Sequence, residues 1–268
     1  GHFFQIPSYN YLYINPDFEV PVGGAIASAT MGNADLEPQK TVQYEVGFQQ
    51  QFGENIGVDV TGFYKDISNL LGSKILTTFT NEIYGQYVNR DYGNVKGLTI
   101  SLTKRYSNGF SANIDYTYSV AEGNASDPQS AFWDAQNNRD SEKQLVYLDW
   151  DQRHTLNGTV LFKLPYKVNV SFIGEYGSGL PYTPTNPSLV GGGFENSARR
   201  PQQVNLDMRL TKSMVFAGRE VSLSANVYNL LDIRNEVSVY TDTGRSGYSL
   251  IPTFTSEDPN WNYNTLAE

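Results

Sequence analysis

The chain has 268 residues, a formal net charge of −9 and no cysteine. It is long enough for one large or two ordinary domains, and its composition excludes disulfides and thiolate chemistry. The acidic balance argues against a nucleic-acid partner, which would need a basic face. No stretch approaches the roughly 18 consecutive apolar residues of a transmembrane helix, although 13% of the residues are aromatic.

The N-terminal quarter of the chain predicts a short strand end, a loop and a pair of strands. Residues 1–6 resemble the end of an earlier strand, and the start without Met or a signal peptide suggests a fragment of a longer mature protein. A loop rich in Tyr, Asn, Pro and Gly is expected over 7–39. Over 40–52, apolar residues then alternate with Thr, Gln and Glu, which predicts a strand. A tight turn at 53–56 leads into a returning strand from residue 57.

The clearest strand lies at Phe110 to Val120, after a predicted long connection at 67–92 and a strand near 98–103. Its even positions are all apolar and its odd positions all polar, which is unbroken period-two alternation. Eleven residues match the roughly 9–11 that a tilted strand needs to cross a bilayer. The stretch therefore predicts a membrane-barrel strand with lipid on one face and water on the other.

The same alternation recurs towards the C-terminus. It predicts strands at 155–163, 168–176, 204–211 and 221–227, and the remainder from Asp232 is mostly turn-forming and aromatic. The predicted connections alternate strictly in length. Short turns are expected at 53–56, 106–109, 164–167 and 213–219, and long loops at 7–39, 67–92, 121–151 and 177–201. This is the pattern of short periplasmic turns and long extracellular loops in outer-membrane barrels.

Aromatic residues lie near both ends of the predicted strands. Phe110 and Tyr118 are spaced so that a strand tilted by about 40° separates them by about 20 Å along the membrane normal. That distance is close to the height of the apolar band between two aromatic girdles. Ordinary strand propensity is the alternative explanation for the tyrosines.

Several motifs resemble those of the C-terminal barrel half of TonB-dependent outer-membrane receptors, and they occur in that family's order along nearly the whole chain. The stretches that carry the resemblance are Asn33 to Thr41 with Tyr44-Glu45-Val46-Gly47, Gly62 to Ile67, Asn89 to Leu98, Asp151-Gln152-Arg153-His154, and Asn226 to Asp232. Departures from the family's pattern occur at Ala34, Gln39 and Thr99.

The resemblance implies an all-β fold, an antiparallel transmembrane β-barrel wall that forms part of a barrel of about 22 strands. We expect residues 1–268 to supply about nine strands, open at both edges as a fragment, with a polar concave face. The resemblance also implies an outer-membrane location and energised uptake of a scarce ligand, such as an iron chelate, cobalamin, a glycan or a peptide. The implied partners are membrane lipid, the remaining strands, a plug domain outside this chain and a periplasmic TonB-type motor protein.

No catalytic, metal or cofactor site is predicted. His2 and His154 are the only histidines, and one imidazole beside Asp151 provides too few ligands for zinc. The stretch Ser126-Asp127-Pro128 lacks the spaced carboxylates of a calcium loop. The glycines at 191–193 are not in the strand-to-helix context of a phosphate loop.

Candidate binding residues fall into two groups. Exposed aromatics of the long loops are candidates for ligand contact, because such rings stack on many ligands; the alternative is that they pack the loops against each other. They are Tyr9, Tyr11, Tyr13, Phe18, Phe132, Trp133, Trp150, Tyr182 and Phe194. Charged residues expected to face the lumen are Glu45, Asp59, Asp115, Glu175, Asp207 and Arg209. We expect the charged groups mainly to be solvated or to pair with each other and with the plug.

Two alternatives to an uptake receptor remain open at this point. A non-transporting barrel of the same lineage would serve as a surface scaffold or adhesin, and an upstream plug and motor-binding segment would distinguish the two. A barrel protease or lipase would need clustered Ser, His or acidic residues at the loop end, and the scarcity of histidine argues against that enzyme class.

Overall fold

The computed structural model describes most of the chain. The described residues are 1–15, 26–81, 83–125, 127–136, 145–185, 194–250, 253–255 and 258–262, and the description of side chains leaves out 26–29 and everything after 250. Phe18, Ser126 and the glycines at 191–193 lie outside the described residues.

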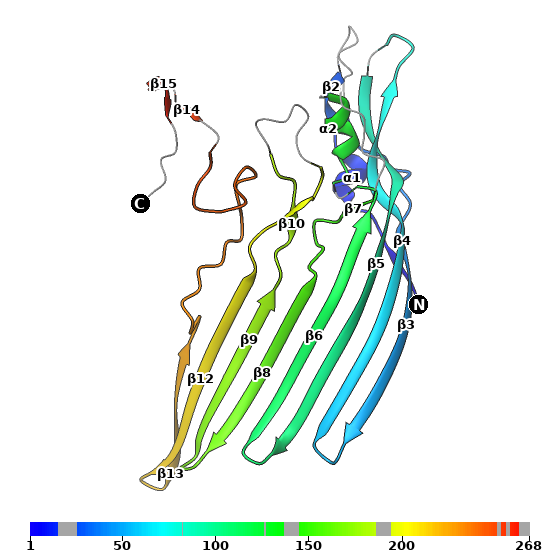
Figure 1. Cartoon of the computed structure of the whole chain (residues 1–268). Coiled ribbons are helices and arrows are strands. Elements are labelled where there is room, and N and C mark those ends of the chain that lie inside the picture. Colours follow the sequence, from blue (N-terminus) through cyan, green and yellow to red (C-terminus); the bar gives the residue numbers. More distant parts are fainter. Residues whose placement is uncertain are drawn as a thin grey trace.

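A single curved antiparallel sheet forms the body of the molecule (Figure 1). Its strands are hydrogen-bonded in the order β1 (His2–Gln5), β3 (Gln39–Phe52), β4 (Ile56–Thr77), β5 (Ile83–Ser107), β6 (Phe110–Gly123), β8 (His154–Leu164), β9 (Val168–Gly177), β12 (Gln203–Phe216) and β13 (Arg219–Val227). Strands β1 and β13 form the two edges and do not pair with each other in the described residues. The expected open wall of about nine strands is confirmed.

Smaller elements gather at one end of this sheet (Figure 1). Strand β2 (Ile26–Met31) pairs in parallel with β5, and β7 (Val146–Tyr147) pairs with β6. Strand β10 (Pro181–Tyr182) pairs with β11 (Ala198–Arg199), and β14 (Thr253–Thr255) with β15 (Asp258–Asn262). The helices are α1 (Tyr9–Tyr13) and α2 (Ser130–Gln136). No helix among the described residues has the length and apolar character needed to cross a membrane.

The strand register places polar and apolar side chains on opposite faces. One row of paired polar residues crosses seven strands: Gln49, Asp59, Ser101, Asp115, Asn157, Glu175 and Asn205. The adjacent row on the other face is almost entirely apolar: Phe48, Val60, Ile100, Tyr116, Leu156, Tyr176 and Val204. Directly opposed residues of neighbouring strands share a face. We call these the polar face and the apolar face.

The connections at the lower end in Figure 1 are tight turns, as predicted. Asn108 and Gly109 join β5 to β6 with φ values of 53° and 89°, and Ala217 and Gly218 join β12 to β13 with φ values of 49° and 75°. Two central residues with positive φ define the type I′ hairpin turn, whose twist matches that of the flanking strands. Because the turns hold only these residues, β12 extends to Phe216, beyond the predicted strand end at 211.

The prediction of a long loop at 67–92 is wrong. Strands β4 and β5 continue through it as a paired hairpin, from Leu70 opposite Asp91 to Thr77 opposite Ile83. Two register shifts, between Ile67 and Leu71, hide the period-two pattern, because each β-bulge reverses the facing of every residue beyond it. The hairpin extends about 30 Å beyond Ser68, the last residue of β4 opposite β3. We call residues 68–92 the hairpin extension.

Phe63 interrupts the polar face because a small apolar cluster covers that face near the loop end. Ile67, Val95, Ala121 and Leu148 are buried, and Phe63 and Leu70 pack against them. Phe63 lies directly opposite Gly97, and a Cβ on Gly97 would lie 2.5 Å from the Phe63 ring. The glycine thus leaves room for the aromatic ring to lie across the neighbouring strand.

Candidate functional site

The connection between β6 and β8 packs back onto the sheet at its loop end. Phe132 of α2 is only 1% exposed, and its ring occupies the space above Gly85 of β5. The expectation that Phe132 is an exposed loop aromatic is therefore wrong. Phe132 belongs to a seven-residue helix and is buried between this helix and β5. For this residue, the structure supports a packing role in place of ligand contact.

Leu148 attaches the end of the same connection to the wall. Its side chain lies against Gly93 and Gly123, which are directly opposed on β5 and β6. The Leu148 N–H donates to the Ala121 carbonyl at 3.1 Å, and β7 adds a short strand to the end of β6. Residues 145–151 are thereby fixed to the loop end of the sheet.

The other loop aromatics have different environments. Tyr11 packs edge-on against Tyr87, with ring centroids 5.0 Å apart, and Tyr182 in β10 is partly buried. The exposed fractions of the remainder are 71% for Tyr9, 61% for Tyr13, 46% for Trp133, 53% for Trp150 and 71% for Phe194. Five of the eight described candidates therefore remain accessible in this chain.

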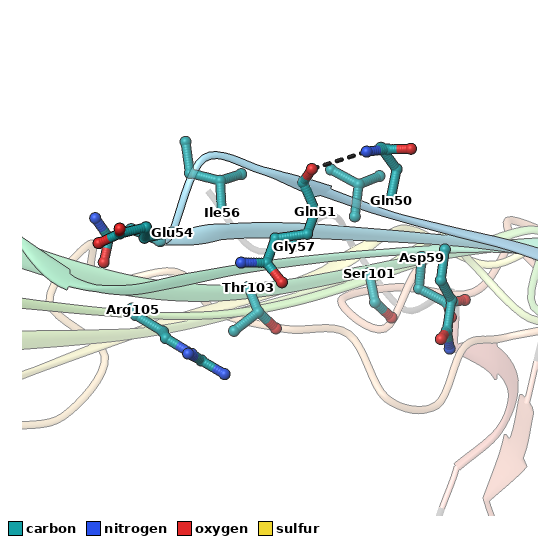
Figure 2. A pocket seen from close by; sticks show the side chains of 12 residues that line it. Gln50, Gln51, Glu54, Ile56, Gly57, Asp59, Ser101, Thr103 and Arg105 are labelled. Atoms are coloured by element: carbon teal, nitrogen blue, oxygen red, sulfur yellow. Dashed lines mark hydrogen bonds between the residues drawn. The ribbon is translucent and has the colours of Figure 1, made fainter.

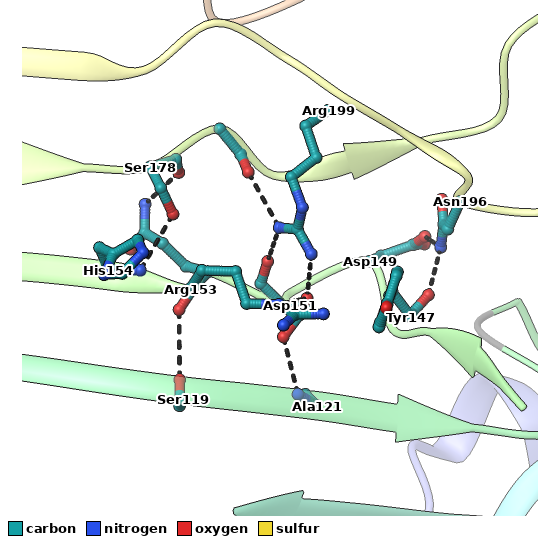
Figure 3. Close-up of polar contacts among 12 residues, drawn as sticks. Ser119, Ala121, Tyr147, Asp149, Asp151, Arg153, His154, Ser178, Asn196 and Arg199 are labelled. Atoms are coloured by element: carbon teal, nitrogen blue, oxygen red, sulfur yellow. Dashed lines mark hydrogen bonds and ion pairs between the residues drawn. The ribbon is translucent and has the colours of Figure 1, made fainter. Parts of the chain in front are cut away.

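Asp151 is the centre of the most connected polar cluster at this end of the sheet (Figure 3). Its side chain has no exposed surface, yet it forms ion pairs with Arg153, at 2.9 Å, and with Arg199. The Ala121 N–H donates to Asp151 Oδ1 at 2.7 Å. A buried carboxylate is tolerated only when its oxygens receive such charged and backbone donors. Here one side chain connects β6, the start of β8 and β11.

The two arginines share one aromatic neighbour. The guanidinium carbons of Arg153 and Arg199 lie 4.4 and 5.3 Å from the centre of the Tyr147 ring, within the range of cation–π attraction. Burial lowers the pKa of Arg153, but hydrogen bonds to Asp151 and Tyr147 outweigh this effect and leave its pKa above the ordinary value. Arg153 therefore stays charged beside Asp151.

A second contact joins the same two chain segments. Asn196 is buried, and its Nδ2 donates to the Tyr147 carbonyl and to Asp149 Oδ1, both at 2.7 Å. Arg199 also donates to the backbone carbonyl of Asp151 at 2.9 Å. We call Tyr147, Asp149, Asp151, Asn196 and Arg199 the loop joint. It connects segment 145–153 to segment 194–200 (Figure 3).

His154 belongs to the apolar face. It is directly opposite Tyr118, whose ring is tilted against it with centroids 5.3 Å apart. Its Nδ1 lies 2.8 Å from the Tyr116 hydroxyl. This position fits the loop-end aromatic girdle. In the described part of the chain, no group of three or more His, Asp and Glu residues is placed to hold a metal ion.

The charged residues expected in the lumen all lie on the polar face by register. Glu45 is opposite Phe63, and Arg209 is opposite Ser171. Asp59 accepts hydrogen bonds from Gln49 and Thr61, and Asp207 accepts one from the Asn229 N–H at 2.8 Å. These partners are uncharged groups of the same wall, so pairing of the charged residues with each other or with a plug, and ligand contact by any of them, remain predictions.

Two hollows lie on the polar face. The first has a volume of about 430 Å³ near the tight-turn end, and Figure 2 shows Gln51, Asp59, Ser101, Thr103 and Arg105 around it. The second, of about 260 Å³, lies below the loop joint and includes Gln152, Asn157, Glu175 and Asn205. Both present amides, hydroxyls and charges, as a surface that contacts water or a polar partner requires.

Asp91 in the hairpin extension is a further buried acid. It is 6% exposed, and burial raises its pKa, although the hydrogen bond from Asn124 Nδ2 and the charge of Arg90 oppose the shift. Asn124 also accepts from the Tyr92 N–H at 2.8 Å. This pair of residues attaches the first residue after β6 to the base of the hairpin extension.

Comparison with known proteins decides the family. The model for "TonB dependent receptor-like, beta-barrel" matches residues 1–230. The chain belongs to this family. It is accordingly part of the wall of an outer-membrane β-barrel, and the resemblance seen in the sequence is confirmed. No curated protein sequence matches the chain.

Solved structures of TonB-dependent receptor type share its fold. The outer membrane transporter YddB from Escherichia coli aligns with a TM-score of 0.54 and 15% identity, over 76% of this chain and 30% of that one. The ferric-catecholate import receptor Fiu from E. coli K12 aligns with a TM-score of 0.54 and 17% identity, over 91% and 29%. The siderophore receptor PiuA from Acinetobacter baumannii gives 0.51 and 15%, over 74% and 25%. The chain thus spans less than a third of the length of these structures.

The TonB-dependent receptor motifs now have physical roles in this chain. In Asp151-Gln152-Arg153-His154, the acid and the arginine belong to the buried ion cluster, and the histidine belongs to the girdle. In Asn226 to Asp232, Asn229 closes the turn after β13 by accepting from the Ile233 N–H at 3.1 Å. Sequence reasoning did not find Arg199, Asn196 or Asn124, because their partners are 48, 47 and 33 residues away.

Proposed function

We propose that this chain is the C-terminal part of the barrel of an outer-membrane receptor that takes up a scarce ligand by energised transport. The ligand class is an iron chelate, cobalamin, a glycan or a peptide. The polar face lines the lumen, where it contacts a plug domain of the same protein, and the apolar face contacts lipid. A periplasmic TonB-type motor protein drives transport through the part of the receptor outside this chain.

The family match over residues 1–230 is the observation that carries the proposal. Membership of a receptor family makes transport a better expectation than catalysis. The unbroken polar row from Gln49 to Asn205 also supports a hydrated inner surface. Ligand contact by Tyr9, Tyr13, Trp133, Trp150 and Phe194 is part of the proposal, because their exposed rings stand at the loop end.

The test separates binding from accumulation. Cells that express the full-length receptor are given a panel of labelled ferric catecholates, ferric hydroxamates, cobalamin, oligosaccharides and peptides. An uptake receptor should bind one class at the surface and accumulate it only while the motor protein is present. Surface binding without accumulation in motor-competent cells would instead identify a scaffold or adhesin. Accumulation that persists after deletion of the motor gene would contradict energised uptake.

A further inference from the structure

We propose that Asp151 and Arg199 act as a lock that makes segments 145–153 and 194–200 one rigid lip at the loop end of the barrel. In this proposal Asp151 is a positioning residue: it contacts no ligand but determines where both segments stand. The proposal concerns the loops alone and stands whether or not the proposed uptake is correct.

The first argument is that the contacts of Asp151 reach in two directions. Through the Ala121 N–H and Arg153 it is connected to β6 and to the start of β8. Through Arg199 it is connected to β11, on the connection that follows β9. A side chain with no exposed surface exchanges its partners poorly with water, so these contacts hold the two segments together as a unit.

The second argument is that the two segments differ in how they are attached to the wall. Segment 145–153 has its own attachments, which are the Leu148 side chain on the opposed glycines and the β6–β7 pairing. Segment 194–200 is attached to the connection after β9 by the β10–β11 pairing and by hydrogen bonds to Thr183, Gly179 and Leu180. Asn196 and Arg199 connect this segment to segment 145–153, so loss of Arg199 should loosen the contact between the two segments selectively.

The third argument is electrostatic. Arg153 and Arg199 lie over the same Tyr147 ring, so two cations share a small, partly buried volume. The Asp151 carboxylate compensates their mutual repulsion. Without the Asp151 charge, as in Asp151→Asn, the same geometry turns from attractive to repulsive, and the two segments should move apart.

The experiment measures distances between pairs of spin labels in the full-length receptor in outer-membrane vesicles. This chain contains no cysteine, so each pair is introduced by substituting exposed positions. Labels at Leu145 and Ser197 report the separation of the two segments. Labels at Tyr92 and Leu145 report the position of segment 145–153 relative to the base of the hairpin extension. All three positions are exposed and lie outside the loop joint.

Three variants give distinct expectations. Arg199→Gln should broaden the Leu145–Ser197 distance distribution and leave the Tyr92–Leu145 distribution unchanged. Asp151→Asn should broaden both. Arg105→Gln is the matched control: it removes an exposed arginine at the tight-turn end, outside the loop joint, so neither distribution should change.

Two results would overturn the proposal. An Arg199→Gln receptor with the same Leu145–Ser197 distribution as the Arg105→Gln control would show that the ion pair does not hold the segments together. Equal broadening of both pairs in Arg199→Gln would assign Arg199 a general role in folding. Because Arg199 is partly exposed, this variant should assemble even if Asp151→Asn does not.

Discussion

The lower part of β6 and the hairpin extension are both antiparallel strand, yet only one was visible in the sequence. In β6, the two faces meet different surroundings, and the side chains alternate without exception from Phe110 to Val120. In the hairpin extension, α2 packs against the strands and β2 pairs with β5. Bulges shift the register, and glycines leave room for other side chains. Side chains therefore alternate only where the two faces of a strand meet different surroundings, and a strand without that difference lacks the pattern.

Removal of the Phe132 ring should have the largest effect on stability, and this effect should be confined to the hairpin extension and α2. Phe132→Ala would leave a cavity above Gly85, at a local cost of about 3–5 kcal/mol. We expect faster hydrogen exchange in residues 83–92 and 127–136 with normal barrel assembly. Trp133→Ala, at a neighbouring position that is 46% exposed, is the control and should change exchange much less. Impaired assembly in Phe132→Ala would show that the hairpin extension and the wall fold as one unit.

In the lower part of β6, the effect of an introduced charge on assembly should depend on which face carries it. Ile114→Lys would place a charge on the apolar face in mid-membrane, at a cost of about 2–4 kcal/mol, whereas Asp115→Lys changes a residue of the polar row. Heat-modifiable mobility on gels measures assembled barrel. We expect a large loss for Ile114→Lys and a small one for Asp115→Lys. Equal loss from the two substitutions would contradict different surroundings for the two faces.

Strands and turns that depend on neighbouring residues could be predicted from the sequence. Side-chain contacts between residues far apart in the chain could not. The alternation and the Asn108-Gly109 turn are local, so the strands and the tight turns were found. Asp151 was noticed only as part of a motif, since Arg199, its partner, comes 48 residues later. Phe132 looked like a binding aromatic because its burial depends on a glycine at position 85 of another strand. Contacts of this kind have no periodic signature.

Asp91 should make the stability of the hairpin extension depend on pH. Because its pKa in the folded protein is raised by burial, its contribution to stability is fully present below its unfolded pKa and is lost as the pH rises through its folded pKa. Protease resistance of residues 83–92 should therefore increase on acidification from neutral pH. Asp91→Asn keeps an acceptor for Asn124 and should remove the dependence. An unchanged pH profile in this variant would exclude Asp91 as its cause.

Protease added to intact cells should produce the mildest change, a nick without loss of the barrel. We expect cleavage within 121–151 or 177–201, which are glycine-, proline- and polar-rich connections. The hairpin extension was expected to be a loop but is paired strand, and it should resist. Cleavage confined to the turns at 53–56 or 164–167 would invert the topology.

The central claim is that one face of this sheet meets lipid and the other meets a hydrated lumen. Single cysteines at consecutive positions from Asn113 to Tyr118 test it directly, when the full-length receptor in native membranes is exposed to a water-soluble thiol reagent and to a lipid-soluble one. The account predicts alternation: Asn113, Asp115 and Thr117 react with the water-soluble reagent, and Ile114, Tyr116 and Tyr118 with the lipid-soluble one. Uniform reactivity along β6 with either reagent would contradict the account.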